Sequence, residues 1–178
     1  MKTLTLLRHA KSGWDDSVSR DFDRPLNPRG RRAARTVGRE MRAQGLAFDL
    51  VLASPAQRVI ETLEEVAAAF GPIEPSFDER LYLAGTAALL ETVRDAPDAV
   101  ERLLLVGHNP GLEELALRLS SPGADRFRRE IEIKYPTGTV VEIELPVERW
   151  AQVKDGTGRL VRFIRPRDLD PELGPDAE

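Results

Sequence analysis

The chain contains no cysteine and only two histidines among its 178 residues. The absence of cysteine excludes thiolate catalysis, disulfide bonds and cysteine-ligated zinc. Two histidines without a clustered carboxylate motif leave too few ligands for a catalytic metal, so we expect neither a metal nor a cofactor. A glycine-rich phosphate loop of the nucleotide-binding kind is also missing from the sequence. Any catalysis is therefore expected to depend on the two histidines and on the charged side chains around them.

Long apolar runs are missing as well, and none approaches the ~20 residues that a membrane-spanning helix needs. The first residues form a short strand-like run that already carries Lys2 and Arg8, which is unlike a signal peptide. The net charge of −4 argues against general binding of nucleic acid. We therefore expect a cytoplasmic protein without a membrane or nucleic-acid partner. The sequence carries no signal for its oligomeric state.

Short apolar runs alternate with longer amphipathic segments, which is typical of an α/β fold. We expect buried strands at residues 3–7, 49–53 and 102–107. A polar residue followed by proline can cap and start a helix, and it occurs at Asn27-Pro28, Ser54-Pro55 and Asn109-Pro110. Later segments, at 131–145 and 158–164, alternate like strands at a sheet edge. The sequence predicts a three-layer α/β/α sandwich with a mostly parallel central sheet.

No linker or internal repeat divides the chain, and its length suits one domain. We predict a single domain over residues 1–165. The remaining residues, 166–178, are rich in proline and acidic side chains, so we expect a flexible tail there.

Both histidines directly follow predicted buried strands. His9 comes after the strand at 3–7, and His108 comes after the strand at 102–107. Ligands of open α/β sheets bind beyond the carboxyl ends of the strands. A single histidine at such a place is more often structural than catalytic, but two in matching positions favour a functional site.

Arginine provides 22 of the 26 basic residues, so its abundance alone indicates no function. Whether an arginine belongs to a functional site has to be judged from its position in the sequence. Arg8 directly precedes His9. Arg58 lies in the first turn of the helix after Ser54-Pro55, from where it can point back over the strand ends. Helix N-termini add N–H donors and partial positive charge at the same edge. Together with the two histidines, these groups predict a site for a dianion such as a phosphoryl group.

Five segments resemble, in order, motifs of the histidine phosphatase superfamily: RHAKSGW, DFDRPLNPRG, ASPAQRVIET, LLVGHNPGLEEL and KYPTGTVVEIEL. The resemblance covers nearly the whole chain and is closest to the small SixA-like phosphohistidine phosphatases. It implies a phosphoglycerate-mutase-like fold and a metal-independent phosphatase. Carried over to the matching positions, it implies that His9 is the nucleophile and forms a phosphohistidine intermediate. Arg8, Arg58 and His108 would then bind the phosphate.

The implied chemistry places opposite demands on the two histidines. His9 must be neutral to attack phosphorus, and nearby Arg8 and Arg58 would lower its pKa. Its other ring nitrogen then needs an acceptor, such as a backbone carbonyl. His108 faces the substrate oxygens, so we expect it to be protonated.

The chain departs from the wider superfamily at two places. Larger members carry an asparagine shortly after the Arg-His pair, where this chain has Asp15 and Asp16, and a carboxylate there would repel phosphate. Phosphomonoesterases of the superfamily also use a carboxylic acid to protonate the leaving alkoxide. Glu79 is the best candidate for this acid, although its surroundings match the family pattern poorly. Glu113 and Glu114 are lesser candidates that we interpret as helix N-terminal charges.

A weak or missing acid is informative about the substrate. An alkoxide is a poor leaving group, whereas imidazole, whose conjugate acid has a pKa of about 6.5, leaves readily. We therefore predict a phosphatase that acts on phosphohistidine of a protein partner. Two alternatives stay open: a phosphatase for a small phosphomonoester with Glu79 as the acid, and a non-catalytic phosphate-binding regulatory module.

Two further groups of charged residues are expected to lie outside the catalytic site. Asp23, Arg24 and Asn27 are expected to hold the loop before the first helix by ion pairing and capping. That helix carries arginines at helical spacing, which form either a solvated face or a surface for an acidic partner: Arg31, Arg35, Arg39 and Arg42.

Overall fold

The structure, a computed structural model, describes residues 1–14, 18, 20–123 and 125–174. Its centre is a six-stranded sheet with the strand order β3-β2-β4-β1-β5-β6. The strands are β1 (Lys2–Arg8), β2 (Leu50–Ala53), β3 (Ser76–Phe77), β4 (Arg102–Gly107), β5 (Val140–Leu145) and β6 (Arg159–Ile164). The first four strands are mutually parallel, and β5 runs antiparallel to both β1 and β6. The predicted α/β fold with a mostly parallel sheet is confirmed.

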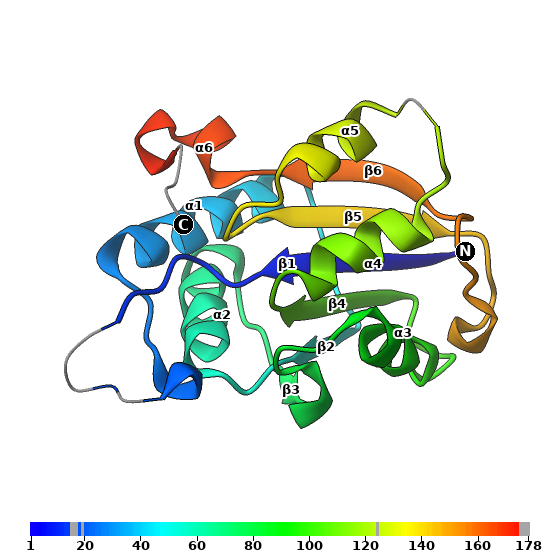
Figure 1. The fold of residues 1–178 in the computed structure, drawn as a ribbon, viewed down its shortest axis with the longest axis horizontal. Helices are drawn as coiled ribbons and strands as arrows, with labels where there is room; N and C mark the ends of the chain where they lie inside the picture. Colours follow the sequence, from blue (N-terminus) through cyan, green and yellow to red (C-terminus); the bar gives the residue numbers. More distant parts are fainter. Residues whose placement is uncertain (15–17, 19, 124, 175–178) are drawn as a thin grey trace.

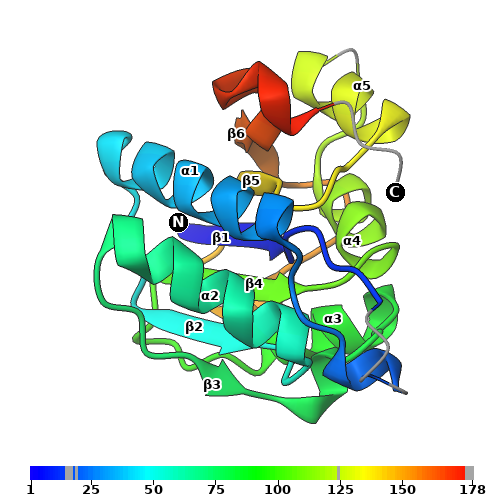
Figure 2. The same ribbon diagram turned by 90° about the vertical axis from the view of Figure 1, so that its left-hand side faces the viewer.

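Helices cover both faces of this sheet (Figures 1 and 2). On one face lie α1 (Pro28–Ala43) and α2 (Gln57–Phe70), and on the other lie α3 (Thr86–Arg94) and α4 (Gly111–Leu119). The short α5 (Arg126–Ile133) packs next to α4 and β6. None of the helices that the structure describes is long and apolar enough to cross a membrane.

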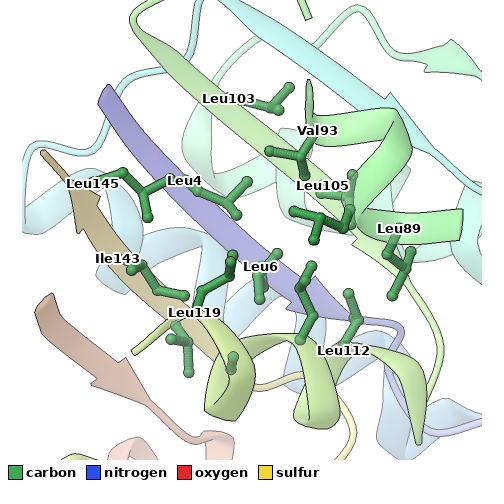
Figure 3. Close-up of a cluster of buried hydrophobic side chains, with 14 of the residues drawn as sticks. Leu4, Leu6, Leu89, Val93, Leu103, Leu105, Leu112, Leu119, Ile143 and Leu145 are labelled. Carbon is green, nitrogen blue, oxygen red and sulfur yellow. The ribbon is translucent and has the colours of Figure 1, made fainter. Parts of the chain in front are cut away.

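The central strand β4 shows how the sheet divides the core. Leu103 and Leu105 pack with α3 and α4, whereas Leu104 and Val106 pack with α1 and α2. All four side chains are completely buried. Figure 3 shows the first of the two clusters, where Leu103 and Leu105 lie among leucines of the neighbouring strands and helices. A strand buried on both faces needs an uninterrupted apolar run, which is what the sequence LLLV provides.

A polar side chain lies at or just before three helix starts, and in α1 it caps the helix. Asn27 accepts a hydrogen bond from the Gly30 N–H at 2.8 Å, so α1 begins at Pro28 as predicted. The next predicted start differs: the Ser54 hydroxyl accepts a hydrogen bond from the Ala56 N–H at 3.3 Å, and α2 begins only at Gln57, without a side-chain cap. Asn109 reaches the Glu113 N–H at 3.3 Å, and α4 begins at Gly111.

Residues 131–133 were expected in a strand and instead form the last turn of α5. The Asp125 side chain caps this helix by accepting hydrogen bonds from the N–H groups of Phe127 and Arg128. The strand begins only at Val140, after the Pro-Thr-Gly turn that precedes it. The cap decides the local structure here, and the alternating apolar pattern does not.

Residues 166–174 were expected to belong to a flexible tail but are packed on the domain. They form α6 (Pro166–Leu169) and the single turn η4 (Pro171–Leu173), and the Leu173 side chain is buried. Arg32 of α1 pairs with the carboxylates of Asp170 and Glu172. Both turns are too short to show helical periodicity in the sequence, so the pattern could not reveal them.

Two of the four arginines on the exposed face of α1 form ion pairs with α2. Arg31 pairs with Glu61 of α2 at 2.7 Å, and Arg35 pairs with Glu65 of the same helix. These ion pairs tie the two helices of one face together, which accounts for half of the four arginines.

The start of α1 lies directly against the loop that follows β1. A Cβ atom on Gly30 would lie 2.0 Å from the carbonyl oxygen of Lys11. The same carbonyl accepts a hydrogen bond from the Asn27 N–H at 3.1 Å. Only glycine permits this approach, which holds the loop after β1 in place.

We predict that Gly30→Ala lowers the free energy of unfolding by about 1–3 kcal/mol, because backbone on both sides must move to admit the methyl group. Gly13→Ala in the same loop is the matched control, since its Cβ would meet only the Asn27 Cβ, at 3.9 Å. The control should change the stability by less than about 0.5 kcal/mol. Urea unfolding measures both, and equal midpoints would contradict the close approach.

Candidate active site

The carboxyl ends of β1, β2 and β4 open into one polar pocket of about 390 Å³. Its lining consists of Arg8, His9, Lys11, Ser12, Asp21, Arg24, Arg58, Leu83, His108, Asn109 and Thr137. The structure therefore brings together the four residues that the sequence singled out as a dianion site. The lining combines four basic side chains with one carboxylate.

Parallel pairing of β1 with β4 places the two histidines side by side. Arg8 ends β1 opposite Gly107, the last residue of β4, so the next residue of each strand is a histidine. The His9 N–H donates to the Gly107 carbonyl at 3.1 Å. The ring centroids of His9 and His108 lie 5.3 Å apart. The main chain therefore sets the spacing of the two rings.

His9 has one ring nitrogen committed to the main chain. Its Nδ1 lies 2.7 Å from the carbonyl oxygen of Ala10, which can only accept, so Nδ1 carries the proton and Nε2 keeps a lone pair. Burial lowers the pKa of His9 well below its usual value, and the charges of Arg8 and Arg58 lower it further. The expected carbonyl acceptor is confirmed, and His9 is neutral, with burial as the largest cause.

Thr62 connects the loop that follows His9 to α2, and the sequence analysis missed it. The Ala10 N–H donates to the Thr62 hydroxyl at 2.9 Å, and that hydroxyl donates to the Arg58 carbonyl at 2.7 Å. Ala10, whose carbonyl holds the His9 ring, is thus hydrogen-bonded through its N–H to the helix that carries Arg58. A buried threonine one turn after an arginine has no distinguishing pattern in one sequence.

Arg58 extends from the first turn of α2 into the pocket and is almost completely buried. Its guanidinium donates to the Asp21 carbonyl oxygen at 2.9 Å and to the Asp21 Oδ2 at 3.0 Å. It also lies 3.3 Å from the Nδ1 of His108. Since a guanidinium only donates, this Nδ1 accepts. The His108 Nε2 then donates to the Ser54 hydroxyl at 2.8 Å.

The surroundings of His108 within the protein favour the neutral ring, whereas the prediction of a protonated ring concerns His108 facing a bound phosphate. Burial and the charge of Arg58 lower its pKa to about 3, although Asp21 acts in the opposite direction. The sequence argument considered only the charge of a bound phosphate and not the cost of burying an imidazolium next to a guanidinium. A bound dianion would raise this pKa again.

Asp21 is the main residue that the sequence analysis did not foresee. Its carboxylate accepts hydrogen bonds from Arg58, from Arg24 Nε at 3.0 Å and from the Tyr82 hydroxyl at 2.6 Å. Burial raises the pKa of Asp21, but the hydrogen bond from Tyr82 and the charge and hydrogen bonds of the arginines outweigh it and lower the pKa to about 2. Asp21 is therefore ionised and acts as a counter-ion for the pocket.

The predicted ion pairing before the first helix is confirmed with different partners. Arg24 pairs with Asp21, and Asp23 pairs with Arg20 at 2.8 Å. The two pairs span η1 (Asp21–Asp23). The pairing of Arg24 with a carboxylate inside the pocket is what places Arg24 among the lining residues.

Glu79, the expected general acid, does not join the other four residues. It lies in η2 (Glu79–Leu81), is exposed, and does not line the pocket. Glu113 and Glu114 stand in the first turn of α4, as expected, and neither lines the pocket. Asp15 and Asp16 lie outside the described residues.

Among residues 1–14, 18, 20–123 and 125–174, no group of three or more histidine or acidic side chains is arranged to hold a metal ion. The described lining itself places a neutral imidazole next to guanidinium groups. Such a set can bind a dianion and attack it.

The two neutral histidines should make the fold sensitive to acid. Histidine in the unfolded chain titrates near pH 6.5, so below that pH the unfolded state binds more protons than the folded state. The free energy of unfolding should fall by up to about 1.4 kcal/mol per pH unit for each histidine as the pH decreases from 6.5 toward about 5. Urea unfolding across this range measures the slope.

His108→Asn should flatten this slope, because one of the two groups is removed. Glu113, whose pKa is raised by burial, opposes the slope equally in both proteins, and Asp21 titrates well below this range. Equal slopes in the wild type and in His108→Asn would show that His108 is not neutral in the folded protein.

Comparison with known proteins identifies a family model that matches the segment holding three of the pocket residues. The family model of the histidine phosphatase superfamily (branch 1) matches residues 4–82, the part that holds Arg8, His9 and Arg58. An uncharacterized protein of Mycobacterium tuberculosis is 40% identical over 164 residues, which cover 90% of this chain and 100% of that protein.

Solved structures show the same fold. A SixA protein from Nakamurella multipartitia, assigned as a phosphohistidine phosphatase, has a TM-score of 0.81 and 27% identity and covers 93% of this chain and 96% of its own. The protein histidine phosphatase SixA complexed with tungstate has a TM-score of 0.73 over 94% of this chain and 99% of its own, with 21% identity, and shows the fold alone. The chain belongs to the histidine phosphatase superfamily.

Proposed function

We propose that this protein is a phosphatase that hydrolyses N-phosphorylated substrates, namely phosphohistidine on a protein, through a phosphohistidine intermediate on His9. The observation that carries the proposal is the state of the single carboxylate among the described residues lining the pocket. Asp21 is ionised and accepts hydrogen bonds from three side chains, so it cannot donate a proton to a leaving group.

The leaving group decides whether the pocket can catalyse hydrolysis without a general acid. An alkoxide must be protonated as it leaves, and a positioned acid contributes about 10²–10⁴-fold to such reactions. Phosphorylated imidazole can instead take its proton from solvent on the ring nitrogen that is not bonded to phosphorus, because imidazole titrates near neutral pH. It then leaves as neutral imidazole. Since none of the described lining residues is a protonated carboxylic acid, the pocket favours phosphohistidine over an alkyl phosphate.

The geometry supports a two-step reaction. The Nε2 lone pair of His9 attacks phosphorus, a new N–P bond forms, and the N–P bond to the substrate imidazole breaks. Arg8 and Arg58 donate to the equatorial oxygens, whose charge must be balanced in the transition state. Water then attacks the phosphohistidine, releases phosphate and restores the neutral ring of His9. The proton stays on Nδ1 throughout, hydrogen-bonded to the Ala10 carbonyl oxygen.

The SixA protein from Nakamurella multipartitia supports the same substrate class, since its name describes a phosphohistidine phosphatase. The exposed position of Glu79 weighs against the alternative of a small phosphomonoesterase with this residue as the acid. The neutral state of His9 weighs against a binding module, because binding of a dianion alone would be served better by a protonated ring.

A comparison of two substrates tests the proposal. We expect kcat/KM for a phosphohistidine peptide to exceed that for an alkyl phosphate by about 10²-fold or more, because only the alkyl ester needs the acid. Phosphate release at neutral pH measures both reactions. Glu79→Gln should change neither rate by more than about twofold, since Glu79 lies outside the pocket.

Two results would contradict the proposal. Efficient alkyl phosphate hydrolysis that collapses in Glu79→Gln would identify a phosphomonoesterase. Absence of turnover on both substrates, with retained binding of phosphate, would identify a binding module. His9→Ala, which removes the nucleophile, is the control for contaminating phosphatase activity in either assay.

A further inference from the structure

The mouth of the phosphate pocket carries an apolar side chain that the reaction itself does not need. Leu83 lines the pocket, and 57% of its surface is exposed. Every other residue of the described lining is polar or charged. A leucine that remains exposed next to guanidinium and imidazole groups contributes nothing to the binding of a phosphoryl group.

The backbone of Leu83 is also unfavourable. Its φ is +50°, and it is the one non-glycine residue with positive φ among the described residues. The left-handed conformation costs a residue with a Cβ roughly 1–2 kcal/mol, and glycine or asparagine would adopt it more easily. An exposed leucine at such a position is therefore doubly unfavourable for folding. Strain of this kind is typical of functional sites.

The neighbours of Leu83 enforce its conformation. Leu81 is buried in the core, and Tyr82 is fixed by its hydrogen bond to Asp21. The Ala84 carbonyl lies against α4, where a Cβ on Gly111 would be only 2.1 Å from its oxygen. The chain is therefore held on both sides of Leu83, and the side chain is displayed at the mouth of the pocket.

A second exposed apolar side chain, Trp14, does not line the pocket itself but lies against one of its lining residues. Trp14 is 62% exposed, and its ring lies 5.1 Å from the guanidinium carbon of Arg24, which lines the pocket. Stacking on an arginine holds an aromatic ring in place while it stays accessible. Trp14 and Leu83 are two of five large apolar side chains that the described residues expose.

We propose that Leu83 is a specificity-determining residue that contacts an apolar side chain next to the phosphohistidine of a protein substrate, with Trp14 extending the same contact surface. This inference rests on the proposed function and deepens it. Free phosphohistidine would fill the polar pocket without reaching the mouth. A protein carries side chains on both sides of the modified histidine, and apolar ones would bury Leu83 and Trp14 on binding.

Three probes with the same reactive group test this proposal: free phosphohistidine, a phosphohistidine peptide flanked by leucines, and the same peptide flanked by serines. The wild-type enzyme should prefer the leucine-flanked peptide. Leu83→Asn should lower kcat/KM for that peptide about tenfold, mainly by raising KM. Hydrolysis of free phosphohistidine should change by less than about twofold. Leu83→Met, which keeps an apolar side chain, should retain the preference.

The matched control is Ile133→Asn, because Ile133 is 83% exposed on α5 and does not line the pocket. It should leave all three rates unchanged. The melting temperature of Leu83→Asn should equal or exceed that of the wild type, since asparagine tolerates the left-handed conformation. A loss of activity combined with higher stability is not what a merely structural role would produce.

Several results would overturn the inference. An equal loss on all three probes would show that Leu83 supports the reacting groups, and no loss on any of them would show that it contacts no substrate. A wild-type enzyme without preference between the peptides would also contradict it. Failure of the proposed function is distinguishable, because the wild type would then hydrolyse none of the phosphohistidine probes, and this inference would fall with it.

Discussion

The hydrogen bond between the His9 Nδ1–H and the Ala10 carbonyl is the interaction on which the rest of the site depends. It places the proton on Nδ1 and leaves the Nε2 lone pair for attack. The Ala10 peptide is held in turn by Thr62, and the following residue, Lys11, lies against Gly30 of α1. Helices on one face of the sheet therefore determine the tautomer of a histidine at the sheet edge. Burial of the same ring keeps it neutral.

One carboxylate, Asp21, offsets part of the positive charge of the pocket. Arg58 lies next to a neutral His108 and is paired with Asp21, which also binds Arg24 and the Tyr82 hydroxyl. Without this carboxylate, buried guanidinium groups would face each other with no counter-ion, at a considerable cost in solvation. The incoming phosphoryl group has to share Arg58 with Asp21. The Asp21 carboxylate thus orients the arginine, and because it is ionised it cannot itself act as an acid.

The sequence alone predicted the part of the site that depends on topology. Two histidines after two buried strands had to lie side by side once the strands paired in parallel. The position of Arg58 near them could be predicted because it lies in the first turn of its helix. Asp21 could not be foreseen, because simple charge reasoning excludes a carboxylate from a phosphate site. The protonation state of His108 depends on burial, which no local pattern encodes. The packed turns after residue 165 are too short to leave a periodic signal.

The most direct test of the account is the identity of the phosphorylated atom. Brief incubation with a phosphohistidine peptide, quenching in alkali and nuclear magnetic resonance of the trapped protein would distinguish the two ring nitrogens. The account predicts an acid-labile phosphoenzyme carrying phosphate on Nε2 of His9, because Nδ1 donates its proton to Ala10. Phosphate on Nδ1, on His108, or on no residue while turnover proceeds would contradict it.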